Sequence, residues 1–383
     1  MNLLSMILAL AIASGQLVKL PIFTQGGVTI LDMVVIFLCL LGLLKLRFQL
    51  KKPPLFIFAA LLFITAASLS LILTPLRLTP IEYFFSFSYT IRFSLFILLG
   101  WLIYQGSFPI LKKDIPSILI ISGSGLAIIG ILQFVFLPDL MFLSKWGWDS
   151  HYFRTVSTFL DPNFAGAYFV LTLILLFAHP RGVLGRHTGI FMILVYLALL
   201  TTFSRSSYLM FLISGSSLAV FKKSKIIFLS VVILFLILLG AFLIYTQLVA
   251  NPRNIDREKS ASFRLNTWQQ GFTLFQKSPL FGIGYNSYRY ALREYKLGPE
   301  QFINSHGASS NDSSLLQVTS TTGIIGLVSF LFFLLTQVKT GGRKNFILTS
   351  GISGLIVHSF FANSLFYPPI LIWIILTAVT SKK

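Results

Sequence analysis

A long polar stretch, residues 251–322, holds the side chains best suited to chemistry. Arginines recur in it with few acids to neutralise them, at Arg253, Arg257, Arg264, Arg289 and Arg293. His306 and Asp312 follow, close to where the chain becomes apolar again. Arginine grips phosphate oxygens through paired hydrogen bonds and keeps its charge in any environment, so the stretch is suited to handling phosphate.

Arg154 and Arg205 extend this set, because both fall where neighbouring apolar segments should end on the same side. Together with Arg264 they could stabilise the negative charge that grows on a departing pyrophosphate. The sequence contains no GxxxxGK[ST] loop and no DxD-like acid pair, and the GxG at 282–284 is a weak signal by itself. We therefore expect a lipid-linked donor, and no nucleotide, metal or other cofactor.

Composition indicates which elements must position these side chains. Of the 383 residues, 55% are hydrophobic and 11% are charged, whereas soluble domains carry roughly a quarter charged residues. The composition is that of a polytopic membrane protein in a phospholipid bilayer. The net charge of +19 lies mostly in short links between apolar runs, so we expect topology signals and phospholipid contact, and no nucleic-acid partner. Cys39 is the single cysteine, which excludes an internal disulfide.

Twelve apolar segments predict an all-α bundle of about twelve transmembrane helices, organised as a single membrane domain over 1–383. Most segments approach the roughly 20 residues that cross a bilayer. The first could instead be a signal peptide, although no basic residue precedes its apolar core. The segments are 3–20, 28–46, 54–75, 80–104, 115–137, 163–179, 188–203, 206–221, 226–250, 313–337, 345–361 and 364–381.

Basic residues recur in alternate links and so predict the orientation. By the positive-inside rule, these links and both termini are cytoplasmic. The large loop 251–312, between the ninth and tenth segments, and the link 138–162 then lie on the extracytoplasmic side. The basic residues are Lys45, Arg47, Lys51, Lys52, Lys112, Lys113, Arg181, Arg186, Lys222, Lys223, Lys225, Lys339, Arg343, Lys344, Lys382 and Lys383.

Two arginines have alternative interpretations. The run 188–221 is too long for one span and basic at both ends, which favours two short passes that meet at an outer turn carrying Arg205. Arg205 could otherwise be an arginine that snorkels at a helix end. Arg92 lies inside a span, where a charge is costly, so it is either functional or paired with Asp32 of the second span.

Within the large loop, apolar residues at spacings of three and four predict an amphipathic helix that ends at Ser278–Pro279 and lies on the membrane or caps the bundle. Gly282 and Gly284 then permit a tight turn. A second helix should follow, with Arg289, Arg293 and Lys296 along one face, and lipid headgroups are an alternative partner for that face. The apolar residues are Ala261, Leu265, Trp268, Phe272 and Phe275.

Four pieces of the chain resemble the family of O-antigen ligases and O-antigen polymerases, which are bacterial membrane glycosyltransferases. They cover roughly the second half of the chain, and their order matches the family as well. The pieces are RTVSTFLDPNFAGAY (154–168), TTFSRSSYL (201–209), FRLNTWQQGFTLFQKSPLFGIGYNSY (263–288) and NDSSLLQVTSTTGIIGL (311–327).

The resemblance implies a helical bundle of the type C glycosyltransferase class in the bacterial inner membrane. Its members transfer a glycan from undecaprenyl pyrophosphate to an acceptor hydroxyl at the outer face, without a metal. Arg205 and Arg264 match arginines that would bind the pyrophosphate, and Arg154 and Asn163 match an earlier external motif. We expect further substrate contacts from Trp268, Arg289, Asn311 and Gln317.

One position departs from the family pattern. The ligase form has a His–Asn pair before the tenth span, and Asp312 and Ser313 stand there in this chain. Asp312 could be the base or only orient the acceptor, and His306 could have taken over the role or be a solvated loop residue. The change favours a polymerase or a general ligase over a lipopolysaccharide ligase. A transporter or flippase of lipid-linked saccharides is the alternative class.

Overall fold

A helix overlaps each of the twelve predicted apolar segments. The computed structural model describes residues 1–23, 26–179, 185–251, 257–341 and 345–380. The helices at these segments are α1 (Leu3–Ser14), α2 (Ile30–Lys45), α3 (Leu55–Ile72), α4 (Pro80–Tyr104), α5 (Pro109–Phe136), α6 (Pro162–Ala178), α7 (Thr188–Thr201), α8 (Arg205–Phe221), α9 (Lys225–Tyr245), α13 (Ser314–Gly341), α14 (Phe346–His358) and α15 (Pro368–Val379). The chain is therefore mostly helical, as the pattern predicts.

Five stretches of the described chain are long and apolar enough to cross a membrane. Four correspond to α3, α4, α5 and α9, and the fifth runs from His306 to Lys339, where α13 forms the apolar part. Shorter apolar helices accompany them at α1, α6, α7, α14 and α15. These lengths fit a polytopic membrane protein, and the full number of spans stays a prediction.

Aromatic side chains hold the centre of the bundle together. The buried ring of Phe63 on α3 lies 5.4 Å from that of Phe93 on α4 and 5.0 Å from that of Phe330 on α13. Phe366 stacks on Phe330 at 4.9 Å. Such pairs gain stability from ring geometry as well as from burial, so α3, α4 and α13 are fixed in one unit.

The prediction of helix over residues 15–20 is wrong, and the fold is not purely α. Helix α1 stops at Ser14, and strands β1 (Lys19–Phe23) and β2 (Gly26–Thr29) form an antiparallel hairpin. Gly15 has a φ of 55°, and an added Cβ would lie 2.5 Å from the carbonyl oxygen of Thr158. The chain therefore turns at Gly15 because it packs directly against η2 (Ser157–Phe159).

The break between α7 and α8 agrees with the prediction of two passes. Phe203 adopts a φ of 48°, and Ser204 is extended with its hydroxyl accepting from the amide of Ser207. A serine in this position satisfies one of the unpaired amides that begin a helix. Arg205 is consequently the first residue of α8 and lies at the turn.

The large loop folds into three helices, α10 (Arg257–Lys277), α11 (Tyr288–Glu294) and α12 (Glu300–Ile303). Helix α10 ends before Ser278, as predicted. Two residues of its apolar stripe, Leu265 and Phe272, are more than half exposed, whereas Trp268 and Phe275 are half-buried. Thr267 and Leu274 are buried. Exposed apolar side chains beside a membrane bundle suit contact with lipid.

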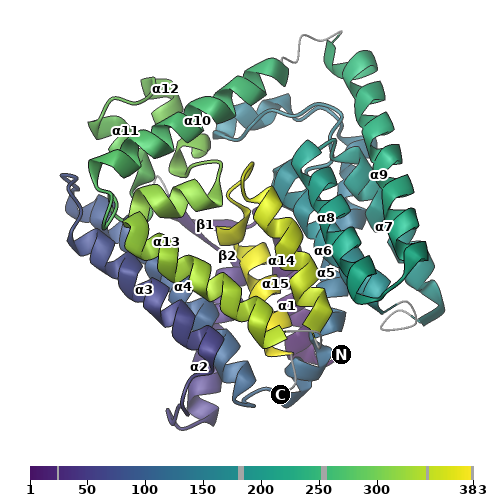
Figure 1. The fold of residues 1–383 in the computed structure, drawn as a ribbon, viewed down its shortest axis with the longest axis horizontal. Helices are drawn as coiled ribbons and strands as arrows, with labels where there is room; N and C mark the ends of the chain where they lie inside the picture. Colours follow the sequence, from purple (N-terminus) through teal and green to yellow (C-terminus); the bar gives the residue numbers. More distant parts are fainter. Residues whose placement is uncertain (24–25, 180–184, 252–256, 342–344, 381–383) are drawn as a thin grey trace.

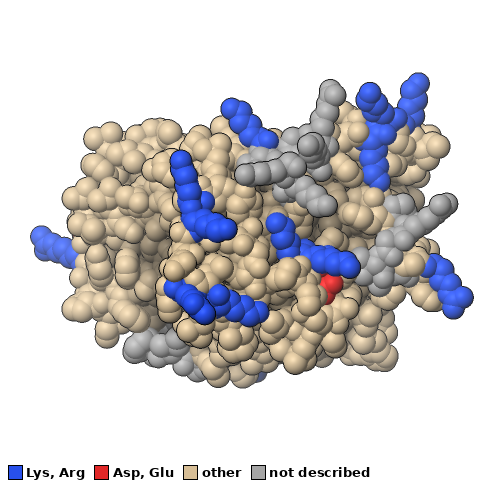
Figure 2. Space-filling view, turned by 90° about the horizontal axis from the view of Figure 1, so that it is seen from below, with Lys and Arg blue, Asp and Glu red and all other residues tan. Residues whose placement is uncertain are grey.

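The helices of the large loop and the N-terminal end of α1 lie at opposite ends of the molecule. In Figure 1, helices α10, α11 and α12 lie together at the top of the view, and the N-terminus lies near the bottom. The face seen from below carries scattered Lys and Arg side chains and little acid (Figure 2). Of the basic residues that predict the orientation, Arg181, Arg343, Lys344, Lys382 and Lys383 lie outside the described residues.

Candidate active site

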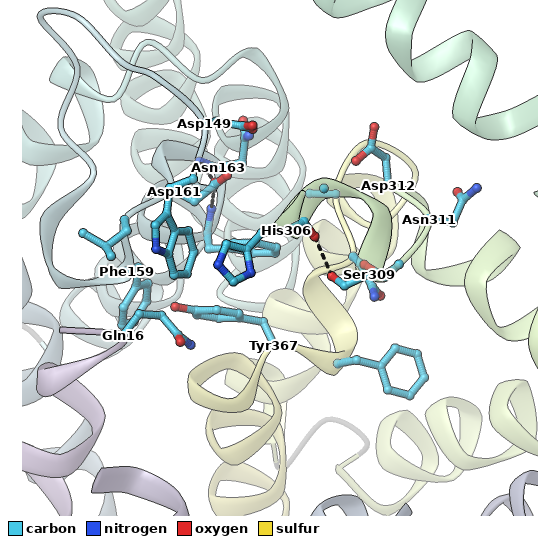
Figure 3. Close-up of a pocket in the computed structure, with 18 of the residues that line it drawn as sticks. Gln16, Asp149, Phe159, Asp161, Asn163, His306, Ser309, Asn311, Asp312 and Tyr367 are labelled. Atoms are coloured by element: carbon cyan, nitrogen blue, oxygen red, sulfur yellow. Dashed lines mark hydrogen bonds between the residues drawn. The ribbon is translucent and has the colours of Figure 1, made fainter. Parts of the chain in front are cut away.

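A cavity of about 830 Å³ opens beneath the large loop and gathers nine of the ten predicted site residues. Its walls come from the link 138–162, the α7–α8 turn, α10, α11 and the segment before α13. The nine residues are Arg154, Asn163, Arg205, Arg264, Arg289, His306, Asn311, Asp312 and Gln317. Figure 3 shows Asp149, Asp161 and Asn163 on one side of this pocket and Asn311 and Asp312 on the other, with His306 between them.

Trp268 is the predicted residue that does not line the cavity. Its ring lies 6.4 Å from that of Phe361, in a tilted arrangement. The indole N–H is buried and has no hydrogen-bond partner among the described residues. Trp268 therefore packs α10 against the bundle, and the expected substrate contact is not supported by its position.

Asp312 and Arg264 form the polar centre of the site. The Asp312 carboxylate accepts a hydrogen bond of 3.3 Å from the hydroxyl of Thr267, one helical turn after Arg264 on α10. Burial raises the pKa of Asp312 to about 6, although the positive charge of Arg264 and the Thr267 hydrogen bond oppose the rise. Asp312 lies before the start of α13, in the turn that follows η6 (His306–Ser309).

Two of the predicted substrate contacts shape this turn. Asn311 is fully buried; its side-chain amide donates to the carbonyl of Thr267 and, at 3.0 Å, to the hydroxyl of Tyr288. Its backbone amide donates to the side-chain oxygen of Gln317 at 2.7 Å. Asn311 and Gln317 therefore fix the backbone on either side of Asp312, so they position this carboxylate.

A second polar network fixes the N-terminus of α8 at the cavity. The hydroxyl of Ser204 donates to the side-chain oxygen of Asn163 at 2.8 Å, and the Ser206 hydroxyl lies 3.3 Å from a ring nitrogen of the buried His358. Arg205 follows Ser204 directly and lines the cavity beside a helix N-terminus, which is a favourable location for an anion. Asn163 thus positions the Arg205 turn.

Arg154, in the link 138–162, forms hydrogen bonds to the same turn. Its Nε donates to the carbonyl of Thr202 at 2.8 Å, and one terminal nitrogen donates to that of Phe203 at 3.4 Å. The guanidinium still lines the cavity. Arg154 therefore combines a structural contact with a positive charge at the site.

Sequence reasoning missed two acids in the cavity, Asp149 and Asp161. Burial raises the pKa of Asp149, and the nearby Arg154 opposes the rise. Asp161 caps α6 by accepting from the amides of Asn163 and Phe164 at 2.6 and 3.0 Å. The Asp-Pro pair that begins α6 is a helix-start signal and could have identified Asp161.

His306 lies in the cavity wall, where it joins the large loop to the link 138–162. Its ring lies 4.7 Å from that of Trp148 in a tilted arrangement, and its amide donates to the carbonyl of Gly147 at 3.3 Å. Burial and the charges of Lys19 and Arg289 lower the pKa of His306, so its neutral form is favoured. His306 is thus an exposed residue of the cavity wall that also contacts Trp148, so the solvated and the functional interpretations both stay open.

The remaining arginines fall into three groups. Arg92 donates to Asp32 at 2.6 Å, so the structural pairing is the one observed, and Arg92 also lines the cavity. Arg289 and Arg293 do not share a role: Arg289 lines the cavity, whereas Arg293 is exposed and pairs with Glu82 at 2.7 Å. Arg253 and the side chain of Arg257 lie outside the described residues.

Comparison with known proteins bears on the central part of the chain. No curated protein matches the sequence. Residues 190–331 match a family model described as O-Antigen ligase. This region contains the α7–α8 turn, the large loop and most of α13, and the family is one of glycan-transferring membrane enzymes in the bacterial inner membrane. The match confirms the resemblance over this region: residues 190–331 are similar to the O-antigen ligase family.

Proposed function

We propose that this protein transfers a glycan from undecaprenyl pyrophosphate to an acceptor hydroxyl at the extracytoplasmic face of the membrane. The observation that carries the proposal is the joint position of Arg264 and Asp312. Both residues line one cavity, and the half-buried Asp312 carboxylate accepts a hydrogen bond from Thr267, in the same turn of α10 as Arg264. Such a site can bind an anionic leaving group and accept a proton at the same time.

The transfer is a single displacement that inverts the anomeric centre. The acceptor oxygen forms a bond to the anomeric carbon while the bond from that carbon to the pyrophosphate oxygen breaks. The electron pair leaves with undecaprenyl pyrophosphate, whose negative charge Arg264 and Arg205 stabilise. The acceptor's proton passes to the carboxylate of Asp312, which later releases it to water, and no metal takes part in these steps.

Geometry supports Asp312 as the base in preference to His306. The His306 ring lies in tilted contact with Trp148, so one side of it is partly covered. Asp312 instead lies beside the arginine that would hold the leaving group. Because this carboxylate stands where the ligase form has histidine, we favour a polymerase or a general ligase, whose acceptor is another repeat unit, a cell-wall glycan or a protein hydroxyl.

Incubation of the purified protein with a synthetic undecaprenyl-pyrophosphate oligosaccharide and a set of acceptors tests this function. We expect a new glycosidic bond of inverted configuration and free undecaprenyl pyrophosphate in equal amount. Addition of a metal chelator should leave the rate unchanged. Movement of the donor across liposomes without any bond formation would instead assign the protein to the flippases.

A further inference from the structure

We infer that the cavity contains a second anion-binding subsite, formed by Lys19, Arg92 and Arg289, which receives a phosphate or carboxylate group of the acceptor. The inference rests on the proposed function for the identity of the two substrates. It assigns the Arg205 and Arg264 region to the donor and this region to the acceptor.

Three separate elements bring these cations together. Lys19 begins β1, Arg92 lies on α4 and Arg289 lies on α11, and all three line the cavity. Lys19 and Arg92 lie close enough for their positive charges to repel each other. The charges of Lys19 and Arg289 both lower the pKa of His306. The hairpin that sequence reasoning did not predict is thus what brings Lys19 to the site.

The cluster has more positive charge than its neighbours neutralise. Asp32 is the carboxylate that faces it among the described residues, and Asp32 already binds Arg92 at 2.6 Å. Burial lowers the pKa of Arg289, which reflects the cost of its charge there. An anion would offset this cost, because opposite charge favours the ionised form.

Arg289 also has a hydrogen-bond donor without a partner. One terminal nitrogen donates to the carbonyl of Ser305 at 2.6 Å, whereas the buried Nε has no partner among the described residues. An unpaired buried donor is costly. A ligand oxygen in the cavity would satisfy it, which is a feature of a binding site rather than of a structural ion pair.

The subsite is distinct from the proposed donor region. The groups that act on Asp312 are Arg264, Thr267 and the two acids Asp149 and Asp161. The groups that act on His306 are Lys19 and Arg289. No residue belongs to both groups. The adjacent rings of His306 and Trp148 form part of the cavity wall. Two charged regions in one cavity fit two substrates that meet there.

Binding of small probes tests the subsite without any donor. Glucose 6-phosphate, glucuronate and glucose are titrated against the full-length protein in detergent by calorimetry. We expect the unchanged protein to bind the two anionic sugars at least about tenfold more tightly than glucose. The double variant Lys19→Gln, Arg289→Gln should lose that preference. Preference for only one of the two anionic sugars would support the subsite and identify its group as phosphate or carboxylate. Equal binding of all three sugars would overturn the inference.

Arg293→Gln is the matched control, because Arg293 lies on the same helix and pairs with Glu82 outside the cavity. It should keep the anion preference. Lys19→Gln alone guards against misfolding, since the Lys19 side chain is only half-buried and makes no hydrogen bond or ion pair among the described residues. A melting curve in detergent accompanies each variant.

Undecaprenyl pyrophosphate binding separates this inference from the proposed function. The Lys19→Gln, Arg289→Gln protein should bind it as the unchanged protein does. Loss of donor binding in that variant would overturn the inference, because the cluster would then belong to the donor. If the unchanged protein forms no glycosidic bond but still prefers anionic sugars, the proposed function fails while the subsite stands.

Discussion

Asp312 has the properties that a base for a hydroxyl acceptor needs. It lies in the cavity, it is held by the Thr267 hydroxyl, and its pKa is raised to about 6 by burial. A base is most effective when its pKa lies near the working pH. Arg264 keeps the rise moderate because its positive charge favours the carboxylate. Arg264 would therefore both bind the leaving group and limit the rise in the pKa of Asp312.

The transfer rate should rise with pH through about 6 and level off above 7, because Asp312 must lose its proton to act. Arg264→Gln removes a charge that lowers the Asp312 pKa, so the rising limb should move to higher pH in addition to the loss of rate. Initial rates between pH 5 and 8.5 measure both effects. Arg293→Gln should leave the limb unchanged, because Arg293 does not line the cavity. A limb unmoved by Arg264→Gln would show that Arg264 does not act on the base.

Asp312→Asn should lower the transfer rate by about 10²- to 10⁴-fold, the usual contribution of a general base. Donor binding should change little, since the base acts on the acceptor's proton. His306→Ala is the competing variant and should keep the rate within about tenfold, because Asp312 is the proposed base and the His306 ring contacts Trp148. An inactive His306→Ala beside an active Asp312→Asn would transfer the base role to His306.

Lysine should replace Arg205 and Arg264 poorly. A lysine ammonium is a point charge that cannot form the planar paired contact with two phosphate oxygens. Each change should cost about a hundredfold in rate, as the loss of one fixed charge contact does elsewhere. Single-turnover kinetics with the lipid-linked donor provide the measurement. A lysine variant with full activity would show that charge alone is sufficient.

At the scale of elements, the loop that follows α10 forms hydrogen bonds at a break in α13, and these bonds fix the position of α10. Gly323 has a φ of 65°, which interrupts α13. The loop after α10 supplies the missing bonds, with the amides of Ile283 and Gly284 donating at 3.0 Å to the carbonyls of Ser320 and Thr321. The position of Arg264 relative to Asp312 therefore depends on this junction.

Gly282→Ala should destabilise the protein by about 2 kcal/mol or more, through a strained backbone and overpacking. Gly282 has a φ of 74°, and an added Cβ would lie 2.3 Å from the backbone of Thr321. Melting in detergent, alongside the transfer rate, measures the effect. Gly125→Ala on α5 is the control, because an added Cβ there meets no atom within 4 Å. Equal melting temperatures for the two variants would contradict this account.

At the scale of the whole molecule, the cavity and the basic links occupy different regions. The cavity lies beneath the large loop, and the face seen from below in Figure 2 carries scattered Lys and Arg side chains and little acid. The positive-inside rule assigns such a face to the cytoplasm. A donor delivered to the outer leaflet would then meet the cavity from the side of the large loop.

Reporter fusions test this orientation. Fusions after Leu50, Lys113 and Ser224 should report the cytoplasm, and those after Trp148 and Glu300 should report the opposite side. Paired reporters that are active on opposite sides provide an internal control at every position. A cytoplasmic signal from Glu300 would contradict the proposed mechanism, because the cavity would face away from a donor in the outer leaflet.

The sequence by itself determined the helical character of the protein and most helix positions. Runs of apolar residues must form helices in a bilayer, since no water is present to satisfy their backbone groups. The break at Ser204 could also be predicted, because the run 188–221 is too long for one span and basic at both ends, and the end of α10 could be predicted from Ser278–Pro279. The arginines could be singled out because a membrane chain has few charges.

Only the tertiary structure decided which of these residues share a cavity and what each one contacts. Asn163, Asn311 and Gln317 bind other side chains or backbone groups, and no periodicity reveals partners that lie so far apart in the chain. Trp268 packs outside the cavity, against Phe361. Lys19 lines the cavity because Gly15 turns the chain against Thr158. The pKa of Asp312 likewise follows from burial and from Arg264, which are consequences of how α10 docks onto α13.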